Sequence, residues 1–157
     1  MSVKDDFKDA VETVLCYLEL EGKYLMLYRN KRKNDYNKGK WIGVGGHIKN
    51  GETIEEALFR EVKEETNLDL YDYNLCATLY FLCDNYKEKI YLFKSSFFSG
   101  KLKECNEGEL KYIDKDKILD LPIFEGDRYF IPRLESNEYF ELFIHYEKDK
   151  LKEVIEL

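Results

Sequence analysis

Three glutamates near the middle of the chain have the spacing that brings carboxylates together on one face of a helix. Glu61, Glu64 and Glu65 stand at i, i+3 and i+4, and side chains at those offsets are neighbours on a helix surface. Like charges at this spacing repel one another, so the group favours a compensating cation. Clustered carboxylate oxygens are the ligands of hard divalent ions such as Mg²⁺ or Mn²⁺. The spacing therefore indicates a metal site, with a solvated, acid-rich helix end as the alternative.

The helix that would present these carboxylates is predicted over Glu52 to Thr66. Thr53 is its expected N-cap, and Glu56, three residues later, is the expected capping-box partner. The apolar residues of the segment fall within about 140° of arc, the kind of face that an amphipathic helix turns toward a core. Glu61 and Glu65 fall within the same arc, so the apolar stripe becomes acidic in its second half.

A glycine-rich loop directly before the helix strengthens the case for a site. The loop reads WIGVGGHIKNG, and glycines let the backbone approach a metal ion or a phosphate closely. Loop and helix together resemble the Nudix signature: Gly46, five residues, Glu52, seven residues, then REVKEETNL. The departure from that signature is Asn67, where the family has glycine. Asparagine is the residue next best able to adopt the left-handed conformation that ends a helix, so the chemistry is expected to remain intact.

The wider chain, from about Thr13 to the C-terminus, is similar to the MutT-type branch, which hydrolyses oxidised purine nucleoside triphosphates. The less specific segments that carry this likeness are GKW at the entry to the glycine-rich loop, Leu121-Pro122, DRYFIP from Asp127 onward and a closing hairpin. The resemblance implies an α/β (α+β) fold: a Nudix-type α/β/α sandwich with a mixed β-sheet, formed by residues 1–157 as a single domain.

The rest of the sequence predicts strands and helices in alternation, as in a mixed α/β or α+β sandwich. Apart from the helix described above, one further helix is expected over Asp127 to Leu134, and the polar, basic stretch Asn30 to Lys40 is expected to be a loop. The expected strands are Val11 to Glu19, Lys23 to Tyr28, Leu75 to Cys83, Ile90 to Ser99, Glu109 to Ile113, Tyr139 to Tyr146 and Leu151 to Ile155.

Composition excludes several classes of protein. A chain of 157 residues with 44% hydrophobic residues can bury a core, and its net charge of −7 argues against a protein that binds a nucleic-acid duplex. Cys16 and Cys76 lie in apolar stretches, are expected in the core, and with the other two cysteines are expected to be reduced thiols. No signal peptide or membrane-spanning run is evident, so a cytoplasmic protein without a membrane partner is expected.

The resemblance assigns roles to the residues of the signature. Glu61, Glu64 and Glu65 would bind Mg²⁺ or Mn²⁺ with the backbone carbonyl of Gly45, and Glu61 would position or deprotonate the attacking water. Glu52 and Arg60 would form the family's orienting pair and complete the catalytic set with Glu61 and Glu64. Glu107 matches a further carboxylate ligand or base of related enzymes, with an ordinary loop acid as the alternative.

The resemblance also suggests a substrate site for a nucleoside triphosphate. Asp127 would hydrogen-bond an oxidised guanine, Phe81 would belong to the base pocket and Phe124 could stack on the ring. Arg29 and Lys40 would meet phosphates unless their segment is only a solvated basic loop. His47 follows the double glycine and is expected to have a phosphate or structural role.

One residue departs from the purine-reading pattern. Ile42 stands where the mammalian oxidised-purine triphosphatase carries a base-reading asparagine, and a hydrophobic side chain cannot make that hydrogen bond. The expected activity is hydrolysis of a nucleoside triphosphate to monophosphate and pyrophosphate, by a monomer or homodimer. The alternatives are ADP-ribose, dinucleoside polyphosphates or capped RNA as substrate, or a Nudix-fold binding module without catalysis.

Overall fold

A long mixed sheet organises the chain, and the computed structural model describes residues 2–157 of it. The strands are β1 (Val11–Leu20), β2 (Lys23–Arg29), β3 (Trp41–Ile42), β4 (Val44–His47), β5 (Asp69–Leu70), β6 (Asn74–Cys83), β7 (Tyr86–Ser95), β8 (Phe98–Ser99), β9 (Gly108–Asp114), β10 (Phe140–Glu147) and β11 (Lys150–Glu156). The helical segments are α1 (Ile54–Thr66) and the 3₁₀ helices η1 (Lys4–Phe7), η2 (Lys115–Asp120), η3 (Glu125–Tyr129) and η4 (Ile131–Glu135).

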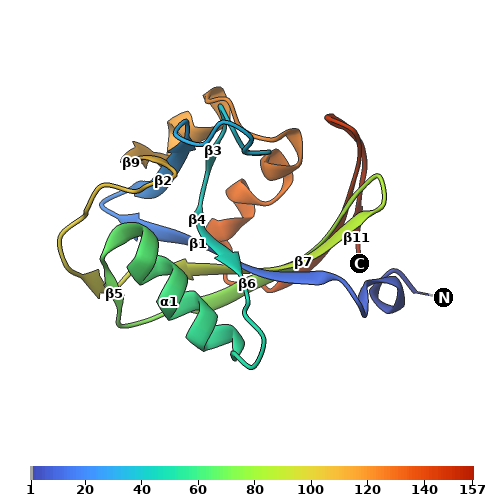
Figure 1. The fold of residues 1–157 in the computed structure, drawn as a ribbon, viewed down its shortest axis with the longest axis horizontal. Helices are drawn as coiled ribbons and strands as arrows, with labels where there is room; N and C mark the ends of the chain where they lie inside the picture. The colour runs from blue at the N-terminus through green and yellow to red at the C-terminus, as the bar shows by residue number, and fades with distance from the viewer. Residues whose placement is uncertain (1) are drawn as a thin grey trace.

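Strand β1 belongs to both parts of the sheet. Residues 11–18 pair in parallel with β7, residues 13–16 pair antiparallel with β4 on the other edge, and the last two residues pair with β2. The main sheet continues from β7 to β6, β10 and β11, and β2 carries β3 and β9 as its other partners. Figure 1 shows α1 on one side of the main sheet and the chain around η3 and η4 on the other. The predicted mixed sheet of an α+β fold is confirmed.

Two hydrophobic clusters fill the space on the two faces of β1. Its alternate residues Val14, Cys16 and Leu18 pack beneath α1, whereas Tyr17 lies in the second cluster, below η3 and η4. This division follows from the strand geometry, since successive side chains point to opposite faces. Both cysteines expected in the core, Cys16 and Cys76, are buried, and all four cysteines are free thiols.

The capping residues of α1 are those that the sequence predicts. The Thr53 hydroxyl accepts a hydrogen bond from the Glu56 amide, and the Glu56 carboxylate accepts one from the Thr53 amide, which completes the capping box. Asn67 ends the helix in the left-handed region, with φ of 70°. The helix itself begins at Ile54, two residues later than the expected start at Glu52.

The predicted helix over Asp127 to Leu134 is wrong as a single element. The chain instead forms η3 and η4, separated at Phe130, whose φ of −118° departs from the value of about −60° found within helices. Pro132 explains the break, because proline lacks an amide hydrogen and suits only the first turn of a helix. It therefore starts a new turn rather than extending the one before it.

One strand prediction and one loop prediction also need correction. The strand expected over Ile90 to Ser99 begins earlier, at Tyr86, and ends at Ser95, with Phe98–Ser99 forming the separate β8. Its first residues are polar because they lie in an exposed part of the hairpin with β6, which turns at Asp84 with φ of 54°. The glycine-rich segment is not only a loop, since it contains β3 and β4.

Candidate active site

Arg60 is the centre of the first half of the candidate site. Its Nε and Nη2 donate to the two carboxylate oxygens of Glu52, at 2.6 and 2.9 Å. Its Nη1 donates to Glu61 at 2.7 Å and to Glu64 at 3.3 Å, and Nη2 also reaches the carbonyl of His47 at 3.1 Å. These bonds lower the pKa of Glu52 to about 2, mainly through Arg60. The predicted pair of Glu52 and Arg60 is thus in contact and holds Glu61 in a defined place.

Strand β4 lies against this half of the site because its glycines leave room. A Cβ on Gly46 would stand 2.6 Å from the carboxyl carbon of Glu61, so only glycine lets that carboxylate lie against the strand. A Cβ on Gly45 would stand 1.9 Å from the carbonyl oxygen of Val14 on β1. The double glycine therefore brings strand backbone, rather than side chains, up to the acidic face of α1.

Glu65 forms the second half of the site with a residue from a distant segment. Its side chain is 6% exposed and accepts a hydrogen bond from the Gly45 amide at 2.7 Å. Its carboxylate also lies beside that of Glu107, just before β9, and the thiol of Cys105, with ligand atoms within 4.8 Å of one another. Burial and, next, the Glu107 carboxyl raise the pKa of Glu65 to about 9.

The donor set fits a divalent cation. Within residues 2–157, no basic side chain lies within ion-pair distance of Glu65. A buried carboxylate must either have a cationic partner or stay protonated. Carboxylate oxygens from α1 and from the chain before β9, together with β4 backbone, are oxygen donors of the kind that Mg²⁺ and Mn²⁺ prefer. Glu61 and Glu64, by contrast, already share Arg60 as a cation.

Arg29, one of the two expected phosphate ligands, is held between two carboxylates. Its Nε donates to Asp35 at 2.6 Å and its Nη1 to Glu107 at 2.8 Å. Asp35 lies in the loop between β2 and β3, so Arg29 connects that basic loop to the acidic cluster. Lys31 also joins the basic loop to the acidic cluster, because its Nζ donates to the carbonyl of Cys105 at 2.9 Å.

The residues predicted to bind a base form a second group around η3. The ammonium group of Lys40 lies 5.6 Å from the centre of the Phe124 ring, and the Tyr36 ring stacks on Phe124 with centroids 5.7 Å apart. Phe81 contacts Tyr146, with ring centroids 5.4 Å apart. Tyr146 in turn accepts a hydrogen bond from the Gly126 amide, next to Asp127.

Asp127 has a strongly raised pKa within this group. Burial raises the pKa of its carboxyl to about 8, against a smaller lowering by Lys40. Ile42 and His47 lie on β3 and β4, and only the backbone carbonyl of His47 joins the Arg60 cluster.

Several polar residues of these two regions were not predicted from the sequence. Asp35, Tyr36 and Cys105 come from loops without periodicity, and only the isolated aromatic of Tyr36 in a basic stretch could have drawn attention. Tyr17 and Tyr146 lie in strands whose apolar pattern hides a polar hydroxyl group. None of the helices described over residues 2–157 is long and apolar enough to cross a membrane.

Comparison with known proteins identifies the family of this chain. The model of the NUDIX domain matches residues 10–134. An oxidized purine nucleoside triphosphate hydrolase of Danio rerio is 27% identical over 111 residues, covering 69% of this chain and 71% of that protein. An uncharacterized Nudix hydrolase of Bacillus subtilis, YvcI, is 25% identical over 122 residues, covering 74% and 73%.

A solved structure agrees over almost the whole fold. The MutT protein of Bacillus halodurans superposes with a TM-score of 0.84 at 24% identity, covering 93% of this chain and 97% of that one. With the family match extending from β1 through η4, and with the Glu52–Arg60–Glu61 contacts in place, this chain belongs to the NUDIX domain family of hydrolases.

Proposed function

We propose that the protein is a divalent-metal-dependent hydrolase that cleaves a nucleoside triphosphate to the monophosphate and pyrophosphate, with oxidised purine nucleotides such as 8-oxo-dGTP as substrates. The observation that carries the proposal is the buried carboxylate of Glu65, which faces Glu107 beside the Gly45 backbone and has no basic partner among the described residues. A buried carboxylate without a basic partner, such as that of Glu65, is stable in its charged form only with a cation.

Glu61, Glu64, Glu65 and Glu107, with the Gly45 carbonyl, would hold Mg²⁺ or Mn²⁺. A divalent ion in such a site neutralises charge on the phosphates and lowers the pKa of water. The protein's own contribution is orientation. Arg60, fixed by the two hydrogen bonds it donates to Glu52, holds one oxygen of Glu61 and would leave the other to accept a proton from water.

The substrate assignment is supported by the second group of residues. Asp127 and the rings of Phe124 and Phe81 offer hydrogen bonding and stacking to a base, and Lys40 offers a positive charge beside Phe124. The Danio rerio relative is named as an oxidized purine nucleoside triphosphate hydrolase. The basic loop is joined to the acidic cluster by the bonds that Arg29 donates to Glu107 and Lys31 to the Cys105 carbonyl, so it would offer positive charge to the phosphates of such a nucleotide.

A substrate panel tests the proposal. Release of pyrophosphate and monophosphate should be measured for 8-oxo-dGTP, the normal deoxynucleoside triphosphates, ADP-ribose and a dinucleoside polyphosphate, each with Mg²⁺ and after EDTA. We expect the highest kcat/KM for 8-oxo-dGTP and no turnover after EDTA. A higher kcat/KM for ADP-ribose would reassign the substrate, and absence of turnover on every compound would support a binding module instead.

A further inference from the structure

The hydroxyl group of Tyr17 is buried without a partner. Tyr17 lies on β1, its side chain is 0% exposed, and its hydroxyl oxygen has no hydrogen-bond partner in the described part of the chain. A buried polar group left unpaired costs about 1–3 kcal/mol, and such groups are rare enough in native proteins to require an explanation. By comparison, the equally buried Tyr24 reaches the Glu135 carboxylate.

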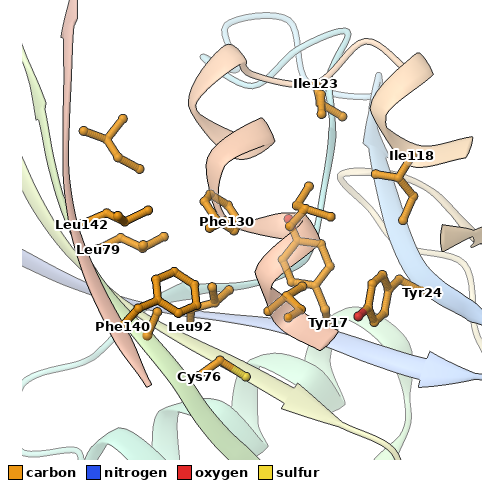
Figure 2. Packing of buried hydrophobic residues seen from close by; sticks show 14 of the residues in the cluster. Tyr17, Tyr24, Cys76, Leu79, Leu92, Ile118, Ile123, Phe130, Phe140 and Leu142 are labelled. Atoms are coloured by element: carbon orange, nitrogen blue, oxygen red, sulfur yellow. The ribbon is translucent and has the colours of Figure 1, made fainter. Parts of the chain in front are cut away.

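The packing of Tyr17 places its ring beside the segment that carries Asp127. Its ring meets Phe130 edge-on with centroids 6.3 Å apart, and Phe130 is bonded through its amide to the Asp127 carbonyl at 3.2 Å. On the other side, a Cβ on Gly43 would lie only 3.0 Å from the Tyr17 ring. Figure 2 shows the ring rising from β1 beside Phe130, with its oxygen pointing away from the strand. Tyr17 thus stands between the segment that carries Asp127 and the segment that carries Ile42.

Asp127 is the second polar group that the protein leaves unpaired here. Its carboxyl makes no side-chain hydrogen bond or ion pair within residues 2–157, and the Asp127 charge is, after burial, the next cause that raises the pKa of Tyr17. The Gly43 amide has a smaller, opposite effect on that pKa. The unpaired Tyr17 hydroxyl is therefore free to donate its O–H to a ligand.

We infer that Tyr17 is a specificity-determining residue that donates a hydrogen bond to a carbonyl oxygen of the bound base, while the Asp127 carboxyl accepts from an adjacent ring N–H. This inference rests on the proposed function. A donor beside an acceptor complements a lactam edge, in which C=O and N–H are neighbours. Guanine, 8-oxoguanine and hypoxanthine present that edge, whereas adenine and cytosine do not. Tyr17 would thus supply the polar contact that Ile42 cannot make.

The Tyr17→Phe variant tests the inference because it removes one oxygen atom and keeps the ring. We expect the melting temperature of the free protein to stay the same or rise, since an unpaired buried group is lost. The kcat/KM for 8-oxo-dGTP and dITP should fall about ten- to a hundredfold, with less than about a threefold change for dATP and dCTP. The matched control, Tyr24→Phe, removes a partnered hydroxyl from the same cluster and should leave the ratio between substrates unchanged.

Calorimetric binding of nucleoside monophosphates separates this inference from the proposed function. IMP and 8-oxo-dGMP should bind the wild type more tightly than AMP, and Tyr17→Phe should abolish the difference even if no triphosphate is hydrolysed. Equal losses for all nucleotides, or a lower melting temperature with unchanged preference, would overturn the inference, because the hydroxyl would then bind only a structural water. Hydrolysis that fails in the wild type while this preference persists would reject the proposed function alone.

Discussion

At the scale of single residues, Arg60 changes how the three glutamates of α1 should be understood. Their spacing suggests three carboxylates of one kind, all lacking a cation, but the structure divides them. Glu61 and Glu64 share the Nη1 group of Arg60, whereas Glu65 turns to Gly45 and Glu107. The positive charge that the spacing leads one to expect from a metal ion is thus supplied in part by Arg60. Only contacts across the fold reveal which carboxylate is left without a cation.

Glu64 provides a test of function against stability. Its side chain is 55% exposed, and its only ion pair among residues 2–157 is with Arg60 at 3.3 Å. An exposed pair of this kind contributes little. Glu64→Gln should leave the metal-free melting temperature within about 2 °C of the wild type. Its kcat should fall by about a hundredfold or more if Glu64 is a metal ligand. Glu55→Gln, an exposed change on the same helix, is the control, and equal activity in both variants would remove Glu64 from the site.

The raised pKa of Asp127 predicts that the free energy of unfolding depends on pH. Its pKa is raised to about 8 in the folded protein, compared with about 3.9 for an unfolded aspartate. Between these values the folded chain keeps a proton that the unfolded chain has lost, so the contribution of Asp127 to stability falls as pH rises through this window. Asp127→Asn should flatten the decline in the free energy of unfolding from about pH 5 to about pH 8, measured by urea denaturation.

The control for this titration is Asp116→Asn, which changes an exposed aspartate of η2. It should retain the slope of the wild type. An unchanged slope in Asp127→Asn would mean that the Asp127 carboxyl is ionised across the same pH range in the folded protein.

At the scale of elements, local patterns predict some features of the fold and miss others. The amphipathic period and the Thr53 capping box identify α1, because both signals lie within the segment itself. The separation of η3 from η4 at Phe130 depends on one proline in an otherwise helical pattern. The pairing of Gly45 with β1 depends on a strand far away in the sequence. Likewise, nothing near Glu107 indicates that it meets Glu65, since only the fold brings them together.

The end of α1 gives a prediction at this scale. Asn67 has φ of 70°, and its side-chain amide donates to the Lys101 carbonyl at 2.9 Å. Asn67→Ala should cost about 1–2 kcal/mol, because an ordinary L residue is strained in the left-handed region. Asn67→Gly loses the amide bond but not the backbone fit, so it should be the more stable of the two in urea denaturation. An alanine variant as stable as the wild type would show that this cap contributes nothing.

At the scale of the whole molecule, the candidate metal site lies where separate parts of the fold meet. Glu61, Glu64 and Glu65 come from α1, Gly45 from β4 in the main sheet, and Glu107 from the chain that leads into β9 on the other side of β2. Arg29 ties Glu107 to the basic loop as well. A cation at this junction would bind only the folded chain, because the unfolded chain does not bring these oxygens together.

Metal binding should therefore stabilise the protein as a whole. Mg²⁺ at about a hundredfold excess over its Kd should add about 2.7 kcal/mol to the free energy of unfolding, seen as a higher melting temperature that EDTA reverses. Glu65→Gln and Glu107→Gln should each lose most of this increase, because each removes a ligand from a different element. Glu147→Gln, an exposed change at the end of β10, should keep it. The same increase in all three variants would show that Mg²⁺ binds elsewhere, and the junction of α1, β4 and β9 would then not be the metal site.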